Sequence, residues 1–156
     1  MNGVSHTLLA LHHGEKRLAA HLTATAERHS AEHEVHHVAT DLAHWSREHA
    51  RRLARAAQDR DTDLTPDPDP DPDDLPAWTT DGHPQPGLLL LHDLRELHLA
   101  ATENSLLWEM LAQVAQATSD DELLTLASSC HPQTLRQMRW TNTMIKTLSP
   151  QILSSL

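Results

Sequence analysis

Five side chains with metal-ligand chemistry interrupt otherwise apolar helical stripes in this sequence. They are Glu15, His49, Glu96, Glu103 and His131. Burying a carboxylate without a partner costs several kcal/mol of folding free energy, so each buried Glu needs a cation, a metal ion or a proton beside it. Glu and His together suit iron, manganese or zinc. The pattern therefore predicts a divalent metal site inside a bundle of helices.

The elements that must position these side chains are four segments with apolar residues at helical spacing. Their predicted ranges are 4–28, 31–58, 88–117 and 121–148. The chain contains no Phe and no Tyr and shows no strand pattern, a composition that favours helices. Short turns follow the first and third segments. The sequence therefore predicts an all-α, antiparallel four-helix bundle of one domain, residues 1–156, with a long crossover over 59–87.

Pro alternates with Asp across residues 66–73 of this crossover. Pro prevents helix formation and the repeated charge extends the chain, so the run is expected to be a solvated spacer, with surface calcium binding as the alternative. Trp78 is expected to dock on the bundle. The last helix is expected to end near residue 149, before Pro150, and to bend or divide at Pro132.

A helical wheel of the third helix predicts two faces. The predicted polar face comprises Leu91, Arg95, His98, Thr102, Ser105, Glu109, Gln113 and Gln116. The predicted core face comprises Leu90, Leu97, Ala100, Leu107, Met110, Leu111, Val114 and Ala115, with Glu96 and Glu103 among them. In the fourth helix the predicted stripe comprises Leu124, Ala127, His131, Leu135, Met138, Ile145 and Leu148. Counting from the turns at 1.5 Å per residue, the ligands of each pair differ in depth by roughly 6–9 Å, and Glu96 by ~16 Å. Long side chains can absorb the smaller mismatch.

Two helix pairs, a long crossover and inward Glu and His residues resemble the ferritin-like fold. The resemblance implies Glu15 and Glu103 as ligands from the first and third helices, and Glu-x-x-His motifs around His49 and His131. Ser46 and Ser128 stand where those motifs require Glu. A single metal ion held by Glu15, His49, Glu103 and His131, with Glu96 or Glu48 as an additional oxygen donor, is therefore expected in place of a di-metal centre. A mycothiol-transferase-like bundle fits less well, because its second histidine on the last helix is missing.

Each candidate residue also has a purely structural interpretation. Glu15 would be a neutral carboxyl group or the partner of an Arg, and His49 and His131 would be hydrogen-bonded core histidines. Glu96 would form an ion pair near the bundle end. His33 and His37 have the i,i+4 spacing of a metal clip, but a solvated face is favoured. Cys130 is expected to be a buried small residue rather than a nucleophile.

Net charge and chain composition narrow the range of functions. The formal charge of −10 argues against nucleic acid as a partner, and no segment is long and apolar enough to span a membrane. With one Cys and no evident signal peptide, a soluble cytoplasmic protein is expected. The function expected first is an iron- or manganese-dependent redox enzyme or oxygenase that binds a metal ion or small molecule. A metal sensor or storage protein and a non-catalytic interaction bundle, including a homodimer, are the alternatives.

Overall fold

Four α-helices form the whole of the regular structure in the part of the chain that the computed structural model describes, residues 2–64, 69–70 and 85–155. They are α1 (Gly3–Arg28), α2 (His33–Asp59), α3 (Pro86–Ala117) and α4 (Asp121–Ser154). The predicted all-α four-helix class is therefore confirmed. Within these ranges no helix has the length and apolar character needed to cross a lipid bilayer.

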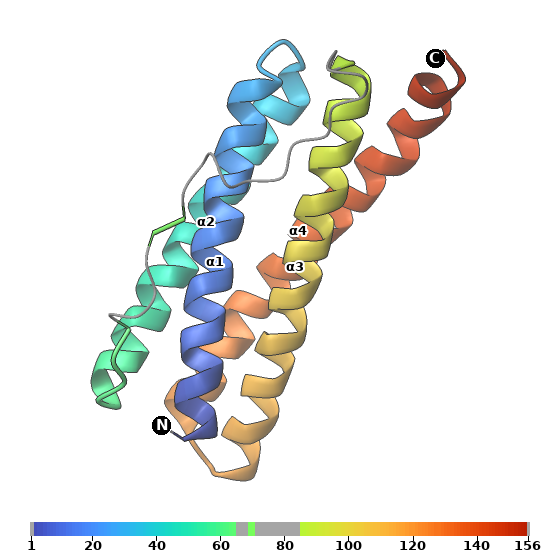
Figure 1. Cartoon of the computed structure of the whole chain (residues 1–156). Coiled ribbons are helices and arrows are strands. Elements are labelled where there is room, and N and C mark those ends of the chain that lie inside the picture. Colours follow the sequence, from blue (N-terminus) through green and yellow to red (C-terminus); the bar gives the residue numbers. More distant parts are fainter. Residues whose placement is uncertain (1, 65–68, 71–84, 156) are drawn as a thin grey trace.

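The helices form two hairpins, α1 with α2 and α3 with α4, that pack mainly through α1 and α3 (Figure 1). α1 and α3 are antiparallel, because Arg28 at the end of α1 contacts Asp93 near the start of α3, and Glu15 contacts Asn104. α3 starts at the end of the bundle where α1 turns into α2, so α2 and α3 run in the same direction. This direction requires the long connection that the sequence predicts.

Most of the Pro/Asp run and Trp78 lie outside the described residues, so the predictions of a spacer, a calcium site and a docked Trp78 remain untested. Asp69 and Pro70 are described. The ammonium group of Lys16 on α1 lies 3.0 Å from the Asp69 carboxylate. The crossover therefore contacts the bundle at this point.

Local capping explains where the helices begin. The Asn2 side chain accepts a hydrogen bond from the Ser5 amide at 2.8 Å, and Asp120 accepts one from the Leu123 amide at 3.2 Å. These contacts satisfy amides that have no partner inside a first helical turn. The expected turn near residue 119 is present, with Ser119 in the left-handed region. α2 begins at His33, two residues after the predicted start of the second helix at residue 31, with Glu32 as its N-cap.

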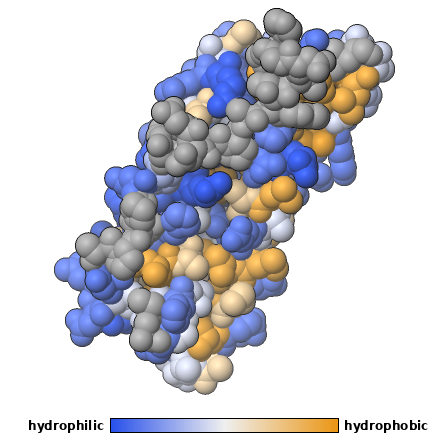
Figure 2. Space-filling model, in the orientation of Figure 1, coloured by the Kyte–Doolittle hydropathy of each residue, from blue (hydrophilic) through white to orange (hydrophobic). Residues whose placement is uncertain are grey.

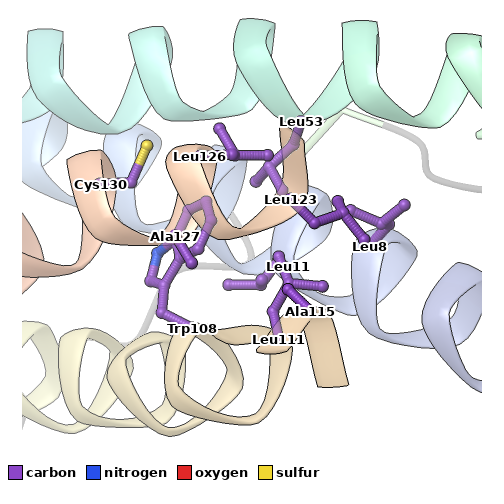
Figure 3. Close-up of a cluster of buried hydrophobic side chains, with 10 residues drawn as sticks. All are labelled: Leu8, Leu11, Leu53, Trp108, Leu111, Ala115, Leu123, Leu126, Ala127 and Cys130. Atoms are coloured by element: carbon purple, nitrogen blue, oxygen red, sulfur yellow. The ribbon is translucent and has the colours of Figure 1, made fainter. Parts of the chain in front are cut away.

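Apolar side chains from all four helices fill the interior. Figure 3 shows the cluster around Trp108, which is fully buried. Its members are Leu8, Leu11, Leu53, Trp108, Leu111, Ala115, Leu123, Leu126, Ala127 and Cys130. A second cluster around Leu18, Leu22 and Leu97 and a third around Leu94 and Met144 continue the core along the axis. These clusters hold the helix pairs together and set the positions of the polar side chains between them.

The predicted core face of α3 is wrong by a fraction of a turn. The buried residues are Leu90, Leu91, Asp93, Leu94, Leu97, Ala101, Asn104, Ser105, Trp108, Leu111 and Ala115. Leu91 and Ser105 were expected on the polar face, while Met110 and Glu103 were expected in the core but are exposed. The cause is a second apolar stripe, Leu99, Leu106 and Met110, on the side opposite the core. When a helix has apolar residues on two opposite sides, a helical wheel does not show which side faces the core. The predicted core face of α3 lies between its buried stripe and its outer stripe.

The predicted stripe of α4 is shifted by about one residue. The buried positions are Leu123, Leu126, Ala127, Cys130, Thr134, Gln137, Thr141 and Met144. Thr134, Gln137 and Thr141 are polar. An apolar pattern therefore selects neighbours such as Leu135 and Met138 in their place. α4 also continues through Pro132 and Pro150 to Ser154, so the expected end near residue 149 and the expected division into two helices are wrong.

Candidate functional site

Glu15 and His49 meet in the middle of the bundle, as the metal-site prediction required of them. Both are buried, with 0% and 1% of their surfaces exposed, and Nδ1 of His49 contacts Oε2 of Glu15. The other carboxylate oxygen of Glu15 accepts hydrogen bonds from Asn104 Nδ2 at 3.0 Å and from Ser46 Oγ at 3.4 Å. Glu15 therefore has partners on both helices that flank α1.

The network continues to α4 through two glutamines. Nε2 of His49 lies 2.7 Å from Oε1 of Gln133, and the Gln137 amide nitrogen donates to Ser46 Oγ at 2.9 Å. The same nitrogen of Gln137 lies 3.1 Å from the Leu42 carbonyl. Six side chains from four helices thus form one interior network: Glu15, Ser46, His49, Asn104, Gln133 and Gln137. We refer to it as the Glu15 network.

Hydrogen-bond rules identify what compensates the buried Glu15. An amide oxygen and a carboxylate oxygen both only accept hydrogen bonds. His49 Nδ1 therefore donates to one oxygen of Glu15, and Asn104 and Ser46 donate to the other. These hydrogen bonds compensate the buried carboxylate in this structure.

The other predicted ligands lie elsewhere, so the expected convergence is wrong. Glu103 is exposed. Glu96 is half-buried and its carboxylate lies 3.5 Å from the Arg95 guanidinium, as its ion-pair interpretation expected. His131 is half-buried and shares a hydrogen bond of 2.8 Å with Ser105 Oγ. The buried faces of α3 and α4 differ from the predicted ones, so these three side chains are turned away from Glu15.

Within the described ranges, no three His, Cys, Asp or Glu side chains lie together in a way that could hold a metal ion. Glu96 and Glu103 do line the same hollow of about 150 Å³ between α1 and α3. Arg17 and His21 line it as well. The carboxylates of Glu96 and Glu103 therefore lie near the cationic side chain of Arg17.

Sequence reasoning missed Asn104, Gln133 and Gln137, and it treated Ser46 only as a missing Glu. One signal could have located Asn104. A Cβ on Gly14 would lie 2.1 Å from Asn104 Oδ1, so the glycine beside Glu15 provides the space for this amide. The Asn104 side chain therefore approaches the backbone of α1 closely at Gly14.

A second buried polar cluster surrounds Asp93 on α3. The Asp93 carboxylate is fully buried and accepts hydrogen bonds from Arg28 Nη1 at 2.8 and 2.9 Å and from His29 Nε2 at 2.7 Å. His21 Nε2 lies 3.6 Å away. Burial alone would raise the pKa of Asp93, but the contacts with His21 and His29 and the charge of Arg28 outweigh burial and lower the pKa well below its ordinary value. No pattern in the sequence predicts this cluster.

Cys130 is buried in the Trp108 cluster, as expected. Burial in apolar surroundings raises the pKa of its thiol to about 12, even though the Arg52 charge acts in the opposite direction. The thiol is therefore protonated at neutral pH and is a weak nucleophile. This supports the structural interpretation of Cys130 over the catalytic one.

Comparison with known proteins adds no identification to this geometry. No protein-family model matches the chain, and no curated protein or solved structure is significantly similar to it. The ferritin-like resemblance therefore rests on architecture alone.

Proposed function

We propose that this chain is a non-catalytic helical bundle that binds another protein through the solvent-facing side of α3. One observation carries the proposal: Leu99, Leu106 and Met110 line up on that side, with 51%, 56% and 56% of their surfaces exposed. A helix that is apolar on both sides is typical of an element buried on both sides. The bundle covers one side of α3, and a partner would cover the other.

The interior of the bundle supports the same proposal. The buried side chains of the Glu15 network bond to one another, and Glu15 and His49 are out of reach of solvent. A polar network of this kind serves to fix the register of packed helices. The proposal therefore assigns the Glu15 network to the specificity of the fold and the outer stripe of α3 to function.

The test is whether the outer stripe contributes to the bundle itself. Leu106→Glu should change the free energy of unfolding by less than about 0.5 kcal/mol, the usual range for surface substitutions, as measured by urea denaturation. Leu153→Glu, at a side chain that is 57% exposed near the end of α4, is the matched control. A loss of more than about 1.5 kcal/mol in Leu106→Glu alone would mean that the stripe has a structural role, and the proposal would fail.

Divalent metal binding of the ferritin-like kind is the second candidate. The contact between Glu15 and His49 favours it, because these two side chains are ligand types for iron, manganese and zinc. Calorimetry with the three metals on protein without a histidine tag would test it. If His49→Ala loses a binding event that His33→Ala retains, a metal function replaces the first proposal. The second variant controls for the surface histidines, of which His33 and His37 have ring centroids 5.5 Å apart.

A further inference from the structure

We infer that the partner of the outer stripe of α3 is an amphipathic helix of another protein, with basic residues flanking its apolar side. The inference rests on the proposed function and specifies its partner. It starts from the spacing of Leu99, Leu106 and Met110, which are seven and four residues apart along α3. This spacing places them in one row along the helix, and such a row packs into the row of a second helix.

The surface around the row has the shape and hydropathy for such a contact. A shallow hollow of about 670 Å³ is lined by Leu106, Glu109, Met110, Gln113 and Val114. Figure 2 shows hydrophobic residues gathered over the middle of α3. All five residues lie on α3, so this surface is one open side of a helix. A second helix packs against such a row through residues at i, i+3 or i+4 and i+7. The row and its hollow therefore suit a helix better than an extended peptide.

The charges beside the row indicate which charge a partner helix should carry. Glu103 and Glu109 are exposed on either side of Leu106. The nearby Arg95 guanidinium lies 3.5 Å from the Glu96 carboxylate, so its charge is already balanced. Arg17 of α1 lines a hollow together with Glu103. With Glu96, Glu103 and Glu109 set against Arg95 and Arg17, the flanks of the row keep a net negative charge, in a chain whose formal charge is −10. Lys or Arg residues beside the apolar side of a partner helix would complement both flanks.

The same charges disfavour two ways of pairing the row with a second copy of this chain, in which Leu106 lies opposite itself or Leu99 lies opposite Met110. If two antiparallel α3 helices pair Leu106 with itself, Glu103 faces Glu109 of the second copy, since both lie three residues from Leu106. If Leu99 pairs with Met110, Leu106 faces Glu103. Like charges across an interface, or a carboxylate against a leucine, oppose association. A basic helix avoids both arrangements.

The experiment uses the full chain and a defined probe, a Leu/Lys amphipathic peptide of about 18 residues, long enough to form a helix. The matched probe is a Leu/Glu peptide with the same leucine positions. In calorimetry at physiological salt, the Leu/Lys peptide should bind the wild type, and the Leu/Glu peptide should not. Leu106→Glu and Met110→Glu should each weaken binding by about tenfold or more, as expected for central contact residues, while Leu153→Glu should leave it unchanged.

The substitutions to Glu separate apolar recognition from simple charge attraction. Each adds a negative charge, so purely electrostatic binding of a cationic peptide would become tighter. Unweakened binding by Leu106→Glu and Met110→Glu, equal binding of both peptides, or no binding of the Leu/Lys peptide would overturn the inference. Dimerisation of the wild type at pH 7 in sedimentation velocity that Leu106→Glu abolishes would also overturn it, while leaving the proposed interaction function intact. The urea measurement tests that function independently of any peptide.

Discussion

At the residue scale, two buried carboxylates are compensated in different ways. Glu15 contacts the His49 ring and accepts hydrogen bonds from two neutral side chains, Asn104 and Ser46. Asp93 contacts the guanidinium of Arg28, so it is held as an ion. This charge pair lies near the bundle end, where Arg28 is 32% exposed. The lowered pKa of Asp93 makes the stability of the fold depend on pH.

The Asp93 arrangement predicts a specific acid response. A carboxyl group with a lowered folded-state pKa contributes stability that is fully present above its ordinary pKa of ~3.9. This stability is lost as the pH falls from the ordinary pKa toward the lower pKa of the folded state. Asp93→Asn should lower the free energy of unfolding at pH 7 by about 3 kcal/mol, because it replaces the charged partner of Arg28 and His29 with a neutral amide. Urea denaturation between pH 7 and pH 3 would measure this. The variant should lose less stability than the wild type on acidification.

Asp41→Asn is the matched control for that measurement, because Asp41 is exposed on α2. It should leave the stability at pH 7 and its acid dependence unchanged. An Asp93→Asn variant as stable as the wild type would show that the ion pair contributes nothing beyond a neutral hydrogen bond.

At the element scale, the pairing of α1 with α3 depends on a glycine. Gly14→Ala would place a Cβ 2.1 Å from Asn104 Oδ1, and Asn104 is 1% exposed and cannot move into solvent. The variant should lose about 1–3 kcal/mol of stability through overpacking and a weakened Asn104–Glu15 hydrogen bond. This loss should exceed the gain of up to ~1 kcal/mol that Ala provides inside a helix. Thermal or urea denaturation would measure the difference.

Gly3→Ala provides the comparison, because a Cβ at Gly3 would meet no atom within 4 Å. Its stability should equal or slightly exceed that of the wild type. If Gly14→Ala were as stable as Gly3→Ala, α1 and α3 could separate slightly at no penalty, and the Glu15 network would not restrain their spacing.

The same scale shows why the sequence predicted the helices better than the site. Each helix has enough apolar residues at helical spacing to be recognised, and α1 shows one clear stripe with Glu15 inside it. α3 has two stripes, so Glu103 was assigned to the core although it lies outside it. In α4 the core contains Thr134, Gln137 and Thr141, which an apolar pattern does not select. Polar side chains that satisfy one another in a core are recognised only when their partners on other helices are known.

At the scale of the whole molecule, net charge and the outer stripe of α3 act in opposite directions. A net charge of −10 keeps copies of the chain apart, while exposed Leu106 and Met110 favour their contact. The isoelectric point is about 5.7, so the repulsion disappears only slightly below neutral pH. Association through the stripe should therefore appear in that range and not at pH 7.

Light scattering between pH 7 and pH 5 would measure this balance. The wild type should scatter most near pH 5.7, where electrostatic repulsion is smallest. Leu106→Gln combined with Met110→Gln should reduce that maximum, because it removes apolar surface without changing the charge or the isoelectric point. Leu153→Gln should retain the maximum, since it removes an equally exposed leucine near the end of α4. If all three proteins scattered alike, low net charge alone would cause association, and the outer stripe of α3 would not be the surface through which the molecules associate.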